Sequence, residues 1–122
     1  MALEDVLQQF RNRLGRDYIS SGVIGLDGVH LAFDSVDICH DEVKAAAELA
    51  DGLKHIMDMV NDTESGSVNY IIIATDACKI FLNPIGDSKK YFNSLTIKAG
   101  GNMGKAILEL EKIEKMLAQE IA

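Results

Sequence analysis

Residues 41–61 read DEVKAAAELADGLKHIMDMVN, and this stretch decides which fold the chain can adopt. Polar and apolar residues recur in it with the period of an α-helix, and Asp41 is placed to cap the first turn. The apolar arc covers about 200° of the helical wheel, whereas a helix lying on one sheet needs little more than 100°. The helix therefore carries more apolar surface than one sheet can cover. Its polar side consists of Lys44, Glu48, Asp51, Lys54, His55, Asp58 and Asn61.

The apolar arc divides into two flanks, so that one can pack on a sheet while the other faces a partner. A glycine inside an exposed helix costs about 1 kcal/mol relative to alanine, so a contact that requires a residue without a side chain is expected at Gly52. Ala45 and Gly52 lie seven residues apart, which lets a second helix approach closely along that line. The alternative is a helix buried deeply within its own domain, with Gly52 making room for a neighbouring side chain. The Leu53 flank is Val43, Ala46, Ala50, Leu53 and Met57, and the Gly52 flank is Ala45, Leu49, Gly52, Ile56 and Met59.

The residues before this helix predict a helix followed by a hairpin. Apolar residues at helical spacing run from Leu3 to Leu14, and Gly15 is placed to end that helix. Residues 18–26 are strand-like, and Asp27-Gly28 is a strong signal for a tight turn. Residues 29–33 form the return strand, which we expect to place Val29, Leu31 and Phe33 on the face opposite His30 and Ala32. Residues 34–40 are a polar connection.

The residues after the long helix predict three strands and a last helix. Residues 68–75 form a strand whose segment Tyr70-Ile71-Ile72-Ile73 is apolar on both faces, so we expect helices on both sides of the sheet. Residues 78–83 form the next strand, which Pro84 and Gly86 should end, and residues 91–98 form the last. Gly100-Gly101-Asn102 should break the chain and cap the final helix. We find no repeat or linker and expect one domain over residues 1–122. The stripe of that helix is Met103, Ala106, Ile107, Leu110, Ile113, Leu117 and Ile121.

Composition argues against several classes of function. A net charge of −7 without clustered lysines or arginines is unsuited to a nucleic-acid surface or an anionic membrane. Cys39 and Cys78 give neither a disulfide framework nor a zinc spacing. The first residues form an amphipathic helix rather than a signal peptide, and no apolar run is long enough to span a membrane. We therefore expect a cytoplasmic, reduced protein.

No catalytic constellation stands out. Residues 100–106 resemble a phosphate-binding loop, but the glycine spacing is wrong and Ala106 replaces the hydroxyl residue that would hold magnesium. His30 and His55 have no nucleophile in a recognisable arrangement. Cys39 beside His40 could be a mildly reactive thiol, and Cys78 is expected to be a small core residue. We expect no catalytic, cofactor or metal site, and no enzyme. The possible metal ligands Asp34, Asp37, Cys39, His40, Asp41 and Glu42 are explained by a solvated loop with a helix cap.

Three segments carry a resemblance to a known family. They are SGVIGLDGVHLA at residues 21–32, EVKAAA at residues 42–47 and IFLNPIG at residues 80–86. In their order and spacing they resemble the first hairpin, the second helix and the fourth strand of the Roadblock/dynein light chain family. The resemblance implies an α/β fold with a five-stranded antiparallel sheet in the order 2-1-5-4-3. The long helix would cover one face and the terminal helices the other.

The resemblance also implies a site and partners. Family members commonly join their third strands and lay their long helices side by side, and they regulate small Ras-like GTPases or act as adaptors. Carried over, this implies a homodimer, or a dimer with a related Roadblock-like chain, that binds a Ras-like GTPase. The alternatives are a structural adaptor that is indifferent to nucleotide and a small-molecule sensor. The implied dimer interface is Ala45, Leu49, Gly52, Ile56, Met59, Val68, Asn69, Tyr70 and Ile71, and the implied partner-binding residues are Lys44, Glu48, Asp51 and His55.

Overall fold

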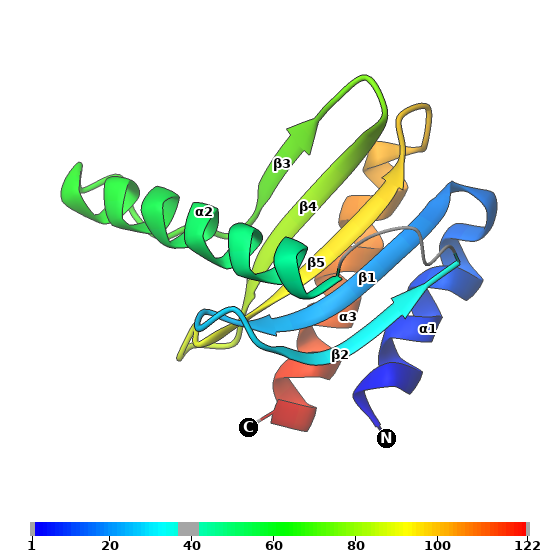
Figure 1. Cartoon of the computed structure of the whole chain (residues 1–122), viewed down its shortest axis with the longest axis horizontal. Coiled ribbons are helices and arrows are strands. Elements are labelled where there is room, and N and C mark those ends of the chain that lie inside the picture. The colour runs from blue at the N-terminus through cyan, green and yellow to red at the C-terminus, as the bar shows by residue number, and fades with distance from the viewer. Residues whose placement is uncertain (1, 37–41, 122) are drawn as a thin grey trace.

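The computed structural model describes residues 2–36 and 42–121 and contains three α-helices and five strands in those ranges (Figure 1). The order is α1 (Leu3–Leu14), a short 3-10 helix η1 (Gly15–Asp17), β1 (Tyr18–Gly25), β2 (His30–Ser35), α2 (Glu42–Asp62), β3 (Ile71–Ala74), β4 (Cys78–Ile85), β5 (Tyr91–Lys98) and α3 (Met103–Ile121). The predicted order of elements is confirmed. The expected cap of α2, Asp41, lies outside the described residues.

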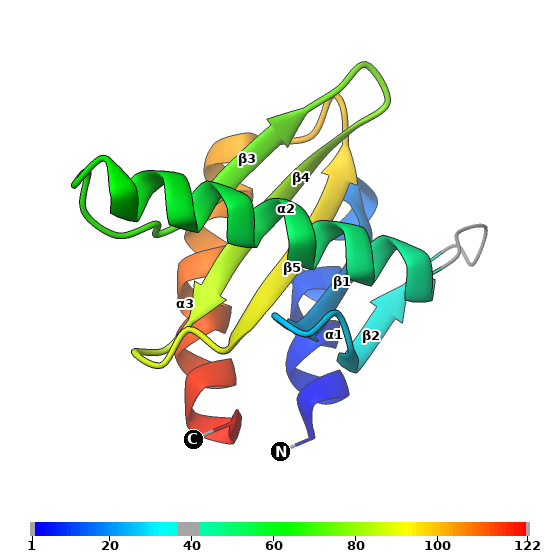
Figure 2. The same ribbon diagram turned by 60° about the vertical axis from the view of Figure 1, so that its left-hand side comes forward.

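The strands form one antiparallel sheet in the order β2-β1-β5-β4-β3, as predicted. Helices α1 and α3 lie together on one face, and α2 crosses the strands on the other face (Figures 1 and 2). The expected arrangement of the three helices is therefore also confirmed. Because α2 crosses the sheet obliquely, part of that face has no helix over it (Figure 2).

The sheet separates two apolar cores. The larger core lies under α1 and α3, where Phe10, Phe81 and Ile113 are among the fully buried side chains. The smaller core lies under α2, where Leu53 packs with Ile24 and Phe92. Strand β3 contributes to both, since Ile72 packs against the larger core and its neighbour Ile71 against the smaller. This explains why the segment is apolar at consecutive positions.

Gly15, Gly28 and Asn102 act as the expected local signals. Gly15 ends α1 with a φ of 57°, and Gly28 takes a φ of 88° in the turn between β1 and β2. A side chain at Gly28 would also come within 3.2 Å of the Ala47 backbone, so a glycine suits both the backbone of this turn and its close approach to α2. Asn102 caps α3, because its Oδ1 accepts the Lys105 backbone N–H at 3.0 Å.

The predicted alternation of β2 is wrong. Val23 pairs with Ala32, but the next residue, Ile24, pairs with His30, so a β-bulge lies at Leu31. The extra residue places His30 and Phe33 against the same cavity on the α2 face, and their rings meet edge to face at 5.3 Å between centroids. Ala32 is the buried residue of this strand, and Leu31 is exposed.

Proline 84 does not end its strand, and β3 is shorter than predicted for a related reason. Strand β4 continues to Ile85, with Pro84 paired to Phe92 of β5. On its other side, β4 pairs with β3 only as far as Leu82, opposite Ile71. Extending that register would place Asn69 opposite Pro84, which has no N–H to donate. Instead the Asn83 side chain donates Nδ2–H to the Asn69 carbonyl at 2.7 Å, and the ladder begins at Ile71.

Candidate interaction site

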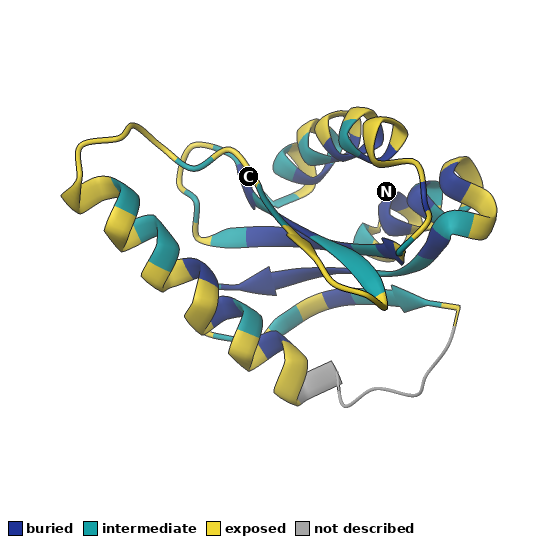
Figure 3. Ribbon diagram, turned by 90° about the horizontal axis from the view of Figure 1, so that it is seen from above, coloured by how far each residue is buried: buried dark blue, intermediate teal, exposed yellow. Residues whose placement is uncertain are grey.

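The two flanks of α2 differ in burial. On the Leu53 flank, Ala46, Ala50 and Leu53 are fully buried against the sheet and Met57 is half-buried. On the Gly52 flank, Ala45 and Gly52 are exposed, and Met59 keeps 57% of its surface exposed. Figure 3 shows the same division along α2, with buried segments toward the sheet and exposed segments away from it. Leu49 and Ile56 of the same flank are half-buried, and Leu49 packs against the core under α2. The sheet therefore buries the Leu53 flank and leaves Ala45, Gly52 and Met59 of the Gly52 flank exposed.

Gly52 has no intramolecular reason to be glycine in the described structure. A Cβ built at Gly52 would have no atom of the described residues within 4 Å, apart from its own local helix backbone. The residue lies inside a helix of 21 residues, where glycine costs about 1 kcal/mol relative to alanine. Within residues 2–36 and 42–121, no side chain of the same domain takes the space beside Gly52, which argues against that alternative.

The predicted partner-binding residues lie on the exposed surface of α2, and Glu48 also borders a cavity beside the helix. Lys44, Glu48, Asp51 and His55 are all exposed. Asp51 also lies 3.9 Å from the Lys54 ammonium group, an exposed ion pair that contributes little stability. The surface has mixed charge, which suits recognition by several weak polar contacts rather than by one anion or cation site.

Strand β3 is one edge of the sheet and β2 is the other. The register of β3 with β4 is regular, and Tyr70 and Ile73 keep 41% and 38% of their surfaces exposed. By contrast, β2 carries the bulge at Leu31, and bulges disfavour pairing with a further strand. Of the two edges, β3 is thus the one whose regular backbone geometry is compatible with pairing to another strand. Among the four predicted interface residues 68–71, only Ile71 lies within the strand; the others lead into it.

The chemical candidates from the sequence have little support. Among the described residues, no three His, Cys, Asp or Glu side chains are grouped as metal ligands, and residues 37–41, which include Cys39 and His40, lie outside that range. Residues 100–106 form the capped start of α3. Cys78 is free and half-buried beside a cavity rather than in either core. None of the described helices is long and apolar enough to cross a membrane.

The sequence did not reveal a hydrogen-bonded cluster that ties α1 to the hairpin. The Tyr18 hydroxyl donates to Asp34 Oδ2 at 2.7 Å and contacts Ser21 Oγ at 2.8 Å. Arg11 Nη2 donates to Asp34 Oδ1 at 3.0 Å and to the Ser35 carbonyl at 2.7 Å. Burial is the main cause that raises the pKa of Tyr18 above its ordinary value, so the hydroxyl stays protonated. These residues are scattered over three elements, which is why sequence spacing does not show them.

Comparison with solved structures supports the predicted fold. No protein-family model matches this sequence, and no curated protein matches it either. Myxococcus xanthus MglB superposes with a TM-score of 0.89 at 8% identity, over 98% of this chain and 94% of that one. A Roadblock/LC7 domain from Streptomyces avermitilis gives 0.86 at 12% identity, over 99% and 98%. An MglB described as having a tetrameric arrangement gives 0.85 at 13%, over 96% and 85%. The chain therefore has the fold of MglB and the Roadblock/LC7 domains.

Proposed function

We propose that this chain, which has the Roadblock/LC7 fold, is a non-enzymatic dimeric regulator or docking platform for a small Ras-like GTPase. The single observation that carries the proposal is the exposed, unexplained glycine at position 52 of α2. Gly52 costs about 1 kcal/mol in helix stability relative to alanine, and a Cβ there would meet no described atom, so an intermolecular contact is the reason we propose for it. Ala45 and Gly52, seven residues apart on one side of α2, let a second α2 helix approach closely there.

The proposed dimer has two contact regions. The Gly52 flank of α2 would form the helix–helix contact, and strand β3 (Ile71–Ala74), the regular sheet edge, would form the strand–strand contact. Joining two β3 edges satisfies the exposed backbone groups and removes an apolar edge from solvent. The MglB described with a tetrameric arrangement is a precedent for self-association on this fold.

The proposed docking surface is the outer side of the paired α2 helices, with Lys44, Glu48, Asp51 and His55 from each copy. A binding protein changes the nucleotide cycle of a GTPase only if it prefers one switch conformation. The arginines do not suggest a catalytic finger on this surface. Arg11 and Arg13 belong to α1 on the opposite face, where they pair with Asp34 and Glu109.

Affinity capture tests the proposal. The tagged full chain is incubated with lysate of its source organism in two arms, one with a non-hydrolysable GTP analogue and one with GDP. We expect a small GTPase to be enriched in one arm only, and the Lys44→Glu variant to capture less of it. Lys105→Glu, which makes the same charge change on exposed α3, is the matched control.

The other outcomes are equally informative. Recovery of the same proteins in both arms would favour the structural adaptor. Recovery of no GTPase in either arm, with the protein folded and dimeric, would contradict the proposal.

A further inference from the structure

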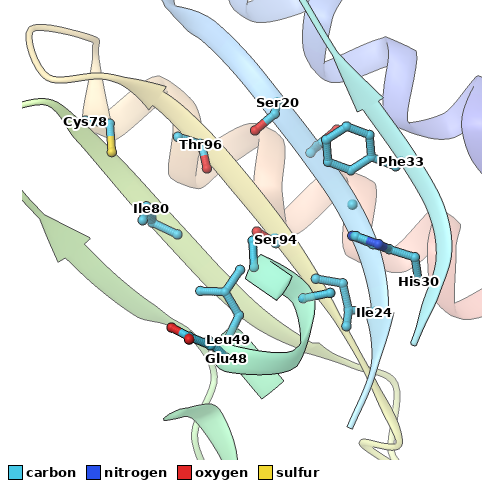
Figure 4. A pocket seen from close by; sticks show the side chains of 14 residues that line it. Ser20, Ile24, His30, Phe33, Glu48, Leu49, Cys78, Ile80, Ser94 and Thr96 are labelled. Carbon is cyan, nitrogen blue, oxygen red and sulfur yellow. The ribbon is translucent and has the colours of Figure 1, made fainter. Parts of the chain in front are cut away.

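A cavity of about 350 Å³ lies beside α2 on the part of the sheet that the helix leaves open (Figure 4). Its floor comes from β1 and β5, its walls from β2, β4 and the first turns of α2. Phe33, Leu49 and Ile80 give it apolar walls. A volume of this size is typical of sites that hold a small molecule.

Three hydroxyl groups line the floor. Ser20 lies opposite Thr96 in the pairing of β1 with β5, and Ser94 lies two residues before Thr96 on the same face. Figure 4 shows these side chains on the two neighbouring strands. None of the three hydroxyls is hydrogen-bonded to another group of the described protein. Ser94 keeps only 7% of its surface exposed, and its hydroxyl lines the cavity without a hydrogen-bond partner among the described residues.

The residues of the cavity restrict what can occupy it. A purely apolar occupant would leave the Ser94 hydroxyl without a partner, which is costly in a buried site. An anion is disfavoured because the described lining includes no lysine or arginine, contains Glu48, and belongs to a chain of net charge −7. The apolar walls match a hydrocarbon ring, and the hydroxyls match one amide, carbonyl or hydroxyl group on it.

We propose that this cavity is a binding site for a small uncharged ring compound whose polar group hydrogen-bonds the hydroxyls of Ser94 and Thr96. The occupant lies between the sheet and α2, so it joins the first turns of the helix to β1 and β5. The site is present in a single copy of the chain and does not depend on a GTPase. Its test therefore needs only the protein alone.

Three probes with the same ring separate the contributions of shape, hydrogen bonding and charge. Benzamide supplies the ring and the polar group, toluene the ring alone, and benzoate the ring with a negative charge. Each is titrated into the isotope-labelled full chain while backbone NMR signals are recorded. We expect benzamide to shift the signals of Ser20, Gly22, Ser94 and Thr96 with a Kd of about 1 mM, the range for a ligand of this size. Toluene should bind about five- to tenfold more weakly, and benzoate should not bind.

Variants identify the hydrogen bond. Ser94→Ala keeps the shape of the floor and should weaken benzamide binding, though not to the level of toluene, because the Thr96 hydroxyl remains. Ser20→Leu fills the cavity and should abolish binding of both, with its own NMR spectrum showing whether it folds. Ser88→Ala removes a hydroxyl from an exposed position outside the cavity and should change neither affinity.

Three results would overturn the proposal. The first is no localised shift with benzamide at about 10 mM, tenfold above the expected Kd. The second is equal binding of benzoate at the same residues. The third is unchanged benzamide affinity in a folded Ser94→Ala variant.

Discussion

Replacing Gly52 should have opposite effects on the single chain and on its self-association. Within one chain, a Cβ at position 52 meets no described atom, so Gly52→Ala keeps the full helix-propensity gain of about 1 kcal/mol. For a chain of 122 residues this corresponds to a rise in Tm of about 4 °C. At the proposed seam the same methyl group must fit between two close helices. Overpacking of that kind costs about 1–3 kcal/mol, or about a five- to hundredfold weaker dimer.

Sedimentation velocity over a range of protein concentrations measures the dissociation constant of the dimer. Thermal unfolding at the lowest concentration measures the Tm of the single chain. Gly52→Arg extends the series, because it adds a long charged side chain to the seam and should leave only monomer. Gly104→Ala is the matched control, since Gly104 is also exposed and helical but lies on α3, on the other face. It should leave the dimer unchanged.

The combination of a more stable chain and a weaker dimer is the signature of a glycine kept for an intermolecular contact. If Gly52→Arg stays dimeric at micromolar concentration, the proposed seam is wrong. A chain that is monomeric throughout the concentration range would also refute the reasoning. The helix destabilisation caused by Gly52 would then not be offset by any dimer contact.

Three further predictions follow from single contacts. Leu53→Ala should lower the free energy of unfolding in urea by about 2–5 kcal/mol, because Leu53 is fully buried under α2, whereas exposed Met59→Ala should change it by about 0.5 kcal/mol or less in the monomer. Tyr18→Phe should cost about 1–3 kcal/mol near pH 8, since it removes the hydroxyl that bonds Ser21 Oγ and Asp34 Oδ2, while Arg11 still holds Asp34 Oδ1. Burial raises the pKa of Tyr18, so above about pH 10 the unfolded chain loses this proton while the folded chain keeps it. The difference in unfolding free energy between wild type and Tyr18→Phe should therefore shrink above that pH. A difference that stays constant with pH would contradict the prediction. Asn102→Ala should cost about 0.5–2 kcal/mol through loss of the α3 cap, and Asn102→Asp should cost less.

Local signals were sufficient for most of the fold. Helical periodicity located α1, α2 and α3, and Asp27-Gly28 located the first hairpin, because these signals depend on residues close together in the sequence. The width of the apolar arc on residues 41–61 also predicted that one sheet would not cover it, and in the described chain Ala45, Gly52 and Met59 stay exposed while Leu49 and Ile56 are half-buried.

The errors occurred where one strand depends on its neighbour. The bulge at Leu31 reverses part of the alternation of β2, and it is visible only in the pairing with β1. Pro84 is tolerated because β4 pairs only with β5 at that point. The residues next to Pro84 in the sequence do not show which strands will lie beside it. The interface residues 68–71 and the outer residues Lys44, Glu48, Asp51 and His55 remain predictions until the dimer and its partner are measured.

The sequence by itself determined the order of elements, the two-sided sheet and the surplus apolar flank of the long helix, because periodicity and turn chemistry act over a few residues. Only the tertiary structure decided which flank stays open and what lies beside it. The oblique crossing of α2 buries the Leu53 flank and leaves a cavity above Ser94, and strand pairing brings Ser20 and Thr96 together across 76 residues of sequence. Such contacts depend on how helix and strands are placed in space, which no local pattern records.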